Sequence, residues 1–272
     1  MATDTGKGYA LITGATMGIG FELAKLFAQD GYNLVLVARS RQDLDRVAQG
    51  FSQQYSVNAI PIAVDLFDPN AAFKLYDDVK AAGITIDVLV NDAGQGQYGL
   101  FIENDIRRYL DLIQLNINSF TVLTHAFLKD MVARNNGKIL QLASIASETP
   151  GPLQAVYHAT KAYVLSLTES LINEVKDSKV TITALQPGVT DTDFFNKADM
   201  LESKAVQDKS KMADPAKVAK DGYAALLKGD DKVVSGLKNK IQVAMGNVIP
   251  DTMIAEQVRK QQEPVDKKEE SK

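Results

Sequence analysis

Tyr157 and Lys161 are the first pair of residues in the sequence whose types and spacing point to chemistry. They stand four positions apart, so on a helix their side chains lie side by side. A free tyrosine titrates near pH ~10 and is a poor base at neutrality, but a neighbouring ammonium stabilises the phenolate and lowers its pKa. Such a tyrosine can move a proton to or from a carbonyl or alcohol oxygen. A lone Y-x-x-x-K pair is a weak signal, because it arises by chance on many helices.

Ser144 strengthens this interpretation because it follows a predicted strand at Lys138–Leu142. A hydroxyl at the end of a strand can face the carboxyl edge of the sheet, where it would hold a substrate oxygen. The two histidines are expected to be structural. His158 follows Tyr157 directly and points elsewhere on the helix, and His125 lies among apolar residues.

A glycine-rich turn, Thr13–Gly20 (TGATMGIG), joins a predicted strand at Tyr9–Ile12 to a predicted helix at Gly18–Asp30. Its glycines are spaced G-x-x-x-G-x-G, which lets the backbone turn sharply and approach a pyrophosphate closely. The start of the helix beyond it offers unpaired N–H groups to the negative charge. This context favours a nucleotide site, although a glycine-rich connector without a ligand is the simpler alternative.

The end of the second predicted strand indicates which nucleotide would bind. A dinucleotide site commonly places an acid about 20 residues past the glycine turn, for the ribose hydroxyls. Here Arg39 and Ser40 stand there instead, and they would suit the 2′-phosphate of NADP(H); a plain surface arginine is the alternative. Asp65 suits an adenine amino group or, equally, a cap for the next helix. Asn91–Gly94 (NDAG) leaves room for a cofactor or forms a simple turn.

Short apolar runs alternate with longer amphipathic segments, which indicates an α/β protein with a mostly parallel sheet covered by helices on both faces. Strands are expected at Tyr9–Ile12, Asn33–Ala38, Asn58–Val64, Ile86–Val90, Lys138–Leu142, Val180–Leu185 and Lys232–Val234. Helices are expected at Gly18–Asp30, Arg41–Gln54, between Pro69 and Gly83, at Ala155–Asp177, and as one continuous region at Ile106–Arg134. No linker divides the sequence, so residues 1–262 are expected to form one domain, with a substrate loop or lid at 190–214 and a C-terminal extension at 237–262. The charged residues 263–272 are expected to be a disordered tail.

The composition excludes several kinds of site. The 272 residues contain no cysteine and two histidines, which rules out disulfides, thiolate nucleophiles and cysteine-bound metals, and we expect no metal. With 30 Lys and Arg against 34 Asp and Glu, the net charge of −4 argues against nucleic-acid binding. No stretch reaches the roughly 20 apolar residues of a membrane span. Residues 1–8 lack an apolar signal core, so a cytoplasmic protein is expected.

Taken together, these motifs resemble the short-chain dehydrogenase/reductase family. The resemblance rests on TGATMGIG at Thr13–Gly20, NDAG at Asn91–Gly94, Asn116, Ser144, Tyr157 with Lys161, and Pro187-Gly188 with Thr190, in the family's order. It extends from about Tyr9 to about Gly236. It implies a single-domain, doubly wound Rossmann fold with a seven-stranded sheet, in a protein that forms a homodimer or homotetramer.

The resemblance also implies roles for individual residues. Tyr157 would be the general acid/base, and Lys161 would lower its pKa and hold the nicotinamide ribose. Ser144 would orient the substrate oxygen, and Asn116 would help hold a water in the proton relay. The implied cofactor-binding residues are Gly14, Thr16, Met17, Gly18, Ile19 and Gly20 at the pyrophosphate, Arg39 and Ser40 at the 2′-phosphate, Asp65 and Leu66 at the adenine, Asn91, Ala93 and Gly94 at the adjacent ribose, and Pro187, Gly188, Val189 and Thr190 at the nicotinamide. Asp92 departs from the family pattern, which has an asparagine at this mainly structural position.

The expected function is therefore NADP(H)-dependent hydride transfer between nicotinamide and the carbonyl or alcohol carbon of a small, apolar substrate. Its pocket is expected to involve Gln95–Leu100, Leu153, Val156 and Thr190–Asp214, where Phe194 and Phe195 either wall the pocket or anchor their loop. Two alternatives stay open. One is a catalytically silent NADP-binding sensor or scaffold, and the other is a dehydratase or epimerase on the same fold.

Overall fold

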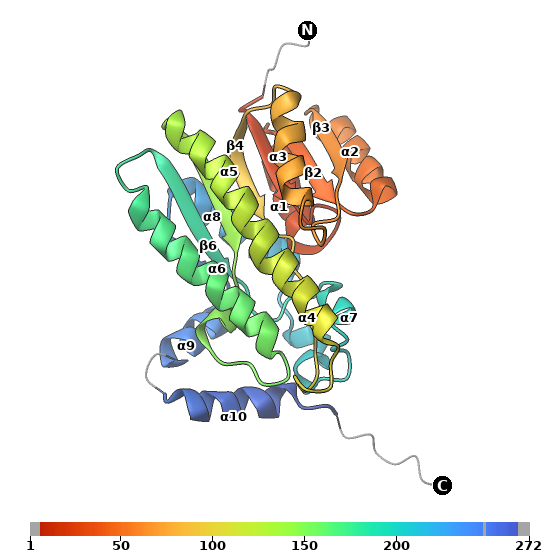
Figure 1. The fold of residues 1–272 in the computed structure, drawn as a ribbon, viewed down its shortest axis with the longest axis vertical. Coiled ribbons are helices and arrows are strands. Elements are labelled where there is room, and N and C mark those ends of the chain that lie inside the picture. Colours follow the sequence, from red (N-terminus) through yellow and green to blue (C-terminus); the bar gives the residue numbers. More distant parts are fainter. Residues whose placement is uncertain (1–5, 247–248, 266–272) are drawn as a thin grey trace.

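The computed structural model describes residues 6–246 and 249–265, and within them seven strands form one parallel sheet in the order β3-β2-β1-β4-β5-β6-β7 (Figure 1). The strands are β1 (Tyr9–Thr13), β2 (Asn33–Ala38), β3 (Ala59–Ala63), β4 (Ile86–Asn91), β5 (Gly137–Leu142), β6 (Val180–Gln186) and β7 (Lys232–Val234). The strand order reverses between β1 and β4, so the sheet is doubly wound and a crevice opens at its carboxyl edge. The predicted single-domain Rossmann fold is confirmed.

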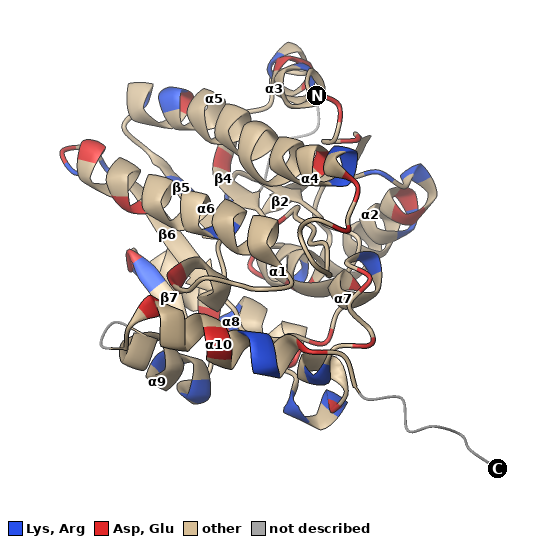
Figure 2. Cartoon of the chain, turned by 60° about the horizontal axis from the view of Figure 1, so that its bottom comes forward, with Lys and Arg blue, Asp and Glu red and all other residues tan. Residues whose placement is uncertain are grey.

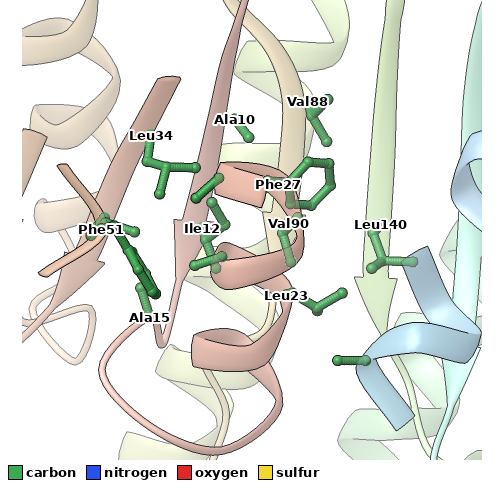
Figure 3. Packing of buried hydrophobic residues seen from close by; sticks show 14 of the residues in the cluster. Ala10, Ile12, Ala15, Leu23, Phe27, Leu34, Phe51, Val88, Val90 and Leu140 are labelled. Carbon is green, nitrogen blue, oxygen red and sulfur yellow. The ribbon is translucent and has the colours of Figure 1, made fainter. Parts of the chain in front are cut away.

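Helices cover both faces of the sheet. One face carries α1 (Gly18–Gln29), α2 (Arg41–Tyr55) and α8 (Pro215–Lys228). The other carries α3 (Ala71–Ala81), α5 (Phe120–Ala133) and α6 (Ala155–Glu174), and α4 (Ile106–Ile113) lies against α6. Figure 3 shows the first core, where Phe27 and Leu23 of α1 pack against Ile12 and Val90 of neighbouring strands.

The strand β2 shows how the sequence builds these two cores. Its run NLVLVA is apolar throughout its middle, as expected for a strand that is buried on both faces. Leu34 and Leu36 point to the face of α1, whereas Val35 and Val37 point to the face of α3. All four side chains are fully buried, so neither face of β2 meets solvent.

The region Ile106–Arg134 is helical as predicted, but it is not one continuous α-helix. A π-helical turn, Gln114–Ser119, separates α4 from α5 and contains Asn116. Ser119 Oγ donates to the carbonyl oxygen of Leu66 at 2.7 Å and so ties the turn to the loop after β3, while Gln114 Nε2 donates to Ser119 Oγ at 3.1 Å within the turn. The apolar period of a helix is too coarse to reveal one widened turn, and such turns frequently mark functional sites.

The helix α8 was not among the predicted elements, although the sequence carries its signals. Pro215 occupies its first turn, Asp214 caps it by accepting from the N–H of Ala216 at 2.9 Å, and Gly229 ends it in a left-handed conformation. Tyr223 packs edge-on against Phe27, with ring centres 4.9 Å apart, so α8 is held against α1.

The chain beyond β6 builds the end of the molecule next to the crevice. It contains α7 (Phe194–Lys197) within the predicted lid, and α9 (Leu237–Gly246) and α10 (Asp251–Gln262) within the predicted C-terminal extension (Figure 1). The first residues of the predicted tail lie against the predicted lid, since the N–H of Lys204 donates to Glu263 and the N–H of Val265 donates to Glu202, each at 2.9 Å. The rest of that tail, 266–272, lies outside the described residues.

Charged residues of both signs are interspersed over the described helices in the view of Figure 2. None of the described helices combines the length and the apolar character that a membrane crossing requires. Among the described residues, no three His, Asp or Glu side chains come together as a group that could hold a metal ion.

Candidate active site

A large cleft of about 1280 Å³ lies at the carboxyl edge of the sheet. Most of the predicted site residues line it: Gly14, Thr16, Met17, Gly18, Ile19, Arg39, Ser40, Asp65, Leu66, Ala93, Gly94, Ser144, Tyr157, Lys161, Pro187, Gly188, Val189 and Thr190. Three predicted residues do not line it, namely Gly20, Asn91 and Asn116. The structure therefore brings residues from both halves of the sequence into one cavity whose volume suits a dinucleotide and a small substrate.

The glycine turn forms one end of the cleft. Gly14 and Gly18 adopt positive φ angles of +73° and +60°, which other residues reach only with strain. Met17 precedes α1 without giving it a side-chain cap, so the first N–H groups of the helix have no capping partner from that residue. A backbone of this kind is suited to an anionic phosphate. The turn therefore fits the pyrophosphate of a nicotinamide dinucleotide.

Arg39 and Ser40 lie where β2 ends. The guanidinium of Arg39 lies 5.5 Å from the centre of the Phe67 ring and forms no ion pair with a described residue. Ser40 Oγ accepts from the N–H of Asp43 at 3.2 Å and thereby caps α2. Asp65 does not cap the helix after it, because it accepts from the N–H of Phe67 at 3.2 Å while α3 begins only at Ala71.

Asn91 ends β4 but turns its side chain into the protein. Its Nδ2 donates to Thr124 Oγ1 at 3.0 Å and to Gln141 Oε1 at 2.9 Å, and the residue is buried. Its side chain therefore holds β4 against its neighbours behind the cleft wall. Thr13, which the sequence analysis did not single out, ties the glycine turn to this loop, since its Oγ1 accepts from the N–H groups of Asp92 and Ala93 at 3.1 and 3.0 Å.

Asp92 brings a carboxylate to the glycine turn. A Cβ atom added to Gly20 would meet its Oδ2 at 2.5 Å, so carboxylate and helix start are in close contact. Burial raises the pKa of Asp92 to about 7, while the charge of Lys161 and the N–H of Gly20 act in the opposite direction. A position that the sequence analysis treated as structural therefore carries a titratable group beside the predicted pyrophosphate site.

Tyr157 and Lys161 lie on α6, with the Lys161 Nζ 5.9 Å from the centre of the tyrosine ring. Burial lowers the pKa of Lys161 to about 8, and the charge of Asp92 partly opposes this shift. The expected lowering of the tyrosine pKa is not found. Burial raises the pKa of Tyr157 to about 12, and the hydrogen bond from Ser144 offsets only part of that rise.

Ser144 and Asn116 are both held by the backbone around them. Ser144 Oγ accepts from the N–H of Ala146 at 3.1 Å and donates weakly to the Pro187 carbonyl at 3.4 Å. Asn116 Nδ2 donates to the Gln95 carbonyl at 2.8 Å, and its Oδ1 accepts from the Gln95 N–H at 3.1 Å. Asn116 thus fixes the loop that forms the cleft wall, from a position behind that wall.

Gly94 is the point where two of these groups meet. A Cβ atom added there would lie 3.4 Å from both Asn116 Oδ1 and Lys161 Nζ. The absence of a side chain at this position therefore lets the amide of Asn116 and the ammonium of Lys161 approach one another across the loop.

The aromatic residues of the predicted lid wall the cleft. The Phe194 ring lies 5.1 Å from the Tyr157 ring and 5.4 Å from the Phe195 ring, and both phenylalanines line the cavity. Of the two interpretations left open by the sequence, the structure favours the pocket wall. Met200 and Val258 add further apolar surface to it.

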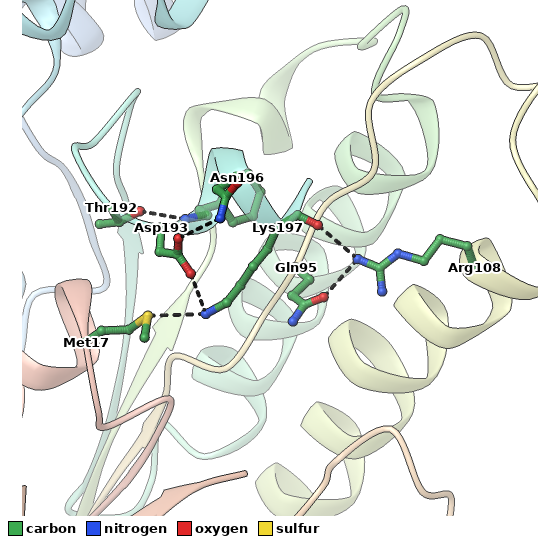
Figure 4. Close-up of polar contacts among 8 residues, drawn as sticks. Met17, Gln95, Arg108, Thr192, Asp193, Asn196 and Lys197 are labelled. Atoms are coloured by element: carbon green, nitrogen blue, oxygen red, sulfur yellow. Dashed lines mark hydrogen bonds and ion pairs between the residues drawn. The ribbon is translucent and has the colours of Figure 1, made fainter. Parts of the chain in front are cut away.

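Polar contacts join the short helix α7 to two other segments that line the cleft (Figure 4). Lys197 Nζ lies 3.0 Å from Asp193 Oδ2 and 3.2 Å from Met17 Sδ, which links α7 to the glycine turn. On the other side, Arg108 Nη2 donates to Gln95 Oε1 at 2.8 Å and to the Lys197 carbonyl at 3.4 Å. These contacts hold the lid between the cofactor end and the substrate end of the cleft.

Comparison with known proteins decides the family. The model of the short chain dehydrogenase family matches residues 8–202. The chain belongs to this family. An uncharacterized oxidoreductase of Bacillus subtilis (strain 168), YmfI, is 30% identical over 231 residues, which cover 84% of this chain and 94% of that protein.

Two further relatives of the short-chain dehydrogenase are informative. A very-long-chain 3-oxoacyl-CoA reductase of Bos taurus is 35% identical over 185 residues, 66% of this chain and 58% of that protein. A solved short-chain dehydrogenase from Sphingobium yanoikuyae in complex with NADPH has a TM-score of 0.78 and 25% identity, over 89% of this chain and 96% of that chain. The present short-chain dehydrogenase is thus an oxidoreductase that acts on CH–OH or C=O groups of a small molecule with a nicotinamide cofactor.

Proposed function

We propose that the protein is an NADP(H)-dependent reductase that transfers a hydride between nicotinamide and the carbonyl carbon of a small, apolar substrate. The observation that carries this proposal is the presence of Tyr157, Lys161 and Ser144 together in one cleft with the glycine turn. When bound there, the nicotinamide supplies or accepts the hydride, and the protein supplies orientation and proton handling.

The proposed proton donor is Tyr157. Its pKa of about 12 keeps the phenol protonated at neutral pH, which suits donation to the oxygen of a ketone as the new C–H bond forms. Ser144 holds the same oxygen by a hydrogen bond. The ammonium of Lys161 stabilises the phenolate that remains. Asn116 positions the wall of the cleft through its hydrogen bond to the Gln95 carbonyl.

The preference for NADP(H) over NAD(H) rests on Arg39 and Ser40. Arg39 forms no ion pair with a described residue, so its charge is available to a 2′-phosphate. The NADPH complex of the relative from Sphingobium yanoikuyae supports this choice. The other residues proposed to hold the cofactor are those of the sequence analysis that line the cleft, with Gly20 and Asn91 supporting them from behind.

The test measures NADPH oxidation against a panel of apolar ketones and, in parallel, the alcohol formed. We expect one alcohol for each NADPH consumed, and loss of turnover with retention of NADPH binding in Tyr157→Phe. A silent sensor would bind NADPH without turnover in either chain. A dehydratase or epimerase would form product without net cofactor oxidation, which would overturn the proposal.

A further inference from the structure

Two amide side chains in the wall of the cleft are buried without a full set of partners. Gln154 and Gln262 are 5% and 8% exposed, and both line the cavity. Gln154 Nε2 and Gln262 Oε1 have no hydrogen-bond partner among the described residues. Buried amide groups are nearly always paired, and a buried group left alone costs free energy. The other described orphan atoms, in Asn91, Arg134, Thr181 and Gln186, do not line this cleft.

Gln154 lies beside the proposed proton donor. It stands three positions before Tyr157, immediately ahead of α6. Its backbone is fixed on both sides, because its N–H donates to the Gly151 carbonyl and its carbonyl accepts from the N–H of His158, each at 3.0 Å. The unpaired amide is therefore carried by a rigid turn at the start of the helix that bears Tyr157, and it lines the same cleft.

Gln262 is carried by an equally firm segment at the end of α10. Its carbonyl oxygen accepts from the Tyr98 hydroxyl at 2.5 Å. The next residue, Glu263, accepts from the N–H of Lys204 at 2.9 Å and forms an ion pair with the same lysine at 3.1 Å. The C-terminal helix is thus attached to the lid and presents its last side chain to the cleft.

One loop connects both glutamines. The N–H of Gly99 donates to the Leu153 carbonyl at 2.9 Å, one residue before Gln154, while Tyr98 in the same loop holds Gln262. The N–H of Tyr98 donates to the Ala198 carbonyl at 2.8 Å, which adds the lid to this assembly. The segments that carry the two amides are therefore tied to one loop and to the lid, at the end of the cleft proposed for the substrate.

We propose that Gln154 and Gln262 bind a second polar group of the substrate, a hydroxyl on the apolar body away from the carbonyl; this inference rests on the proposed function. A hydroxyl accepts one hydrogen bond and donates another, so it satisfies an orphan N–H donor and an orphan oxygen acceptor together. If the orientation of both amides is exchanged together, the two hydrogen bonds reverse their direction and a hydroxyl still satisfies both groups. The substrate class is therefore a hydroxylated apolar ketone.

The experiment uses matched probes: aliphatic methyl ketones of graded length, each with its ω-hydroxy counterpart. In the wild type we expect kcat/KM for at least one hydroxy ketone to exceed that of its parent by about three- to tenfold, mainly through KM. Gln154→Leu and Gln262→Leu should each bring this ratio close to one. Gln257→Leu, an exposed position on the same helix outside the cleft, should keep the wild-type ratio.

Thermal shift with the same probes provides a readout that needs no turnover. Replacement of an orphaned amide by leucine should leave the thermal midpoint of the free protein equal or higher, because no hydrogen bond is lost. The hydroxy ketone should raise the midpoint of the NADPH-bound wild type more than its parent does, and this difference should vanish in both leucine variants. Equal shifts for hydroxy and parent ketones in the wild type would overturn the inference. If no ketone is reduced, the proposed function fails. The thermal shifts would still show whether Gln154 and Gln262 bind the hydroxyl group.

Discussion

The Nζ of Lys161 donates a 2.6 Å hydrogen bond to the carbonyl oxygen of Leu142, the last residue of β5. This bond fixes the ammonium at the carboxyl edge of the sheet, beside the ring of Tyr157. Leu142, which accepts the bond, stands two residues before Ser144. The strand that precedes the serine therefore also anchors the lysine, so two of the proposed catalytic groups share one rigid support.

Replacement of this lysine separates activity from stability. In Lys161→Met we expect kcat/KM for ketone reduction to fall by about 10²–10⁴-fold, because the phenolate loses its neighbouring cation. The pKa of Lys161 falls from 10.5 unfolded to about 8 folded, so its buried charge destabilises the fold below about pH 8, and this cost disappears as pH rises toward 10.5. The midpoint of thermal unfolding should therefore be higher for the variant than for the wild type below about pH 8, and equal to that of the wild type above pH 10.5. A lower midpoint at neutral pH would contradict this account.

The protonation of Tyr157 predicts different pH profiles for the two directions of the reaction. Reduction uses the phenol, which stays protonated across the neutral range because the pKa is about 12. Oxidation uses the phenolate. At pH values below the pKa, the phenolate fraction increases about tenfold for each unit by which the pH increases. Steady-state kcat/KM should therefore be flat for the ketone and rise with pH for the alcohol up to about pH 8, above which Lys161 loses its charge and both values should fall away from these trends. An alcohol profile that levels off near neutral pH would show that the bound complex lowers this pKa instead.

Asp92→Asn tests the carboxylate at the glycine turn. The pKa of Asp92 rises from 3.8 unfolded to about 7 folded, so the folded chain binds more protons and stability falls as pH rises through that window. The amide variant should gain stability at alkaline pH and little at acid pH, and it should bind NADPH more tightly at alkaline pH, since a charge next to the pyrophosphate is removed. Thermal midpoints and fluorescence titrations check both. Asp111→Asn, at an exposed site on α4, is the control, and an equal gain at both pH values would refute the charge argument.

Arg39→Ala tests cofactor selection. Loss of a charge-assisted hydrogen bond to the 2′-phosphate should weaken NADPH binding by about 10–100-fold and leave NADH binding within about twofold. Arg46→Ala, an exposed arginine on α2 paired with Asp43, should alter neither cofactor. Titration of cofactor fluorescence measures both constants. Equal weakening of NADH would mean that Arg39 supports the fold of the cleft rather than the phosphate.

Local signals were sufficient to predict much of the fold. The strand β2 is found at its predicted bounds because an apolar run buried on both faces, followed by a cap at Ser40, leaves little freedom for its ends. The glycine turn at Thr13–Gly20 was also predicted at its observed place, because its glycines and the adjacent strand and helix signals are local. Both features depend on neighbours within a few residues.

The features that the sequence did not reveal depend on contacts between distant residues. The side chain of Asn91 turns inward because it donates a hydrogen bond to Gln141 on the neighbouring strand. Gln262 lies at the cleft because its carbonyl oxygen accepts a hydrogen bond from Tyr98, which is 164 positions earlier in the sequence. The pKa of Tyr157 follows from the burial that Phe194 and its neighbours impose. The spacing of residues within a motif does not indicate any of these contacts between distant parts of the chain.

The π-helical turn at Gln114–Ser119 makes the length of one helix part of the chemistry. Such a turn holds one more residue than an α-helical turn but spans about the same rotation, so it accommodates the extra residue without turning the helix beyond it. Deletion of Asn118 would give a more regular helix and still leave Asn116 in the chain. The buried face of α5 would keep its place against the sheet, but the Asn116 amide inside the turn would point in a different direction and lose its two hydrogen bonds with Gln95. A comparison of homologues by residue identity alone would miss this requirement, whereas a count of residues between Ile106 and Ala133 would detect it.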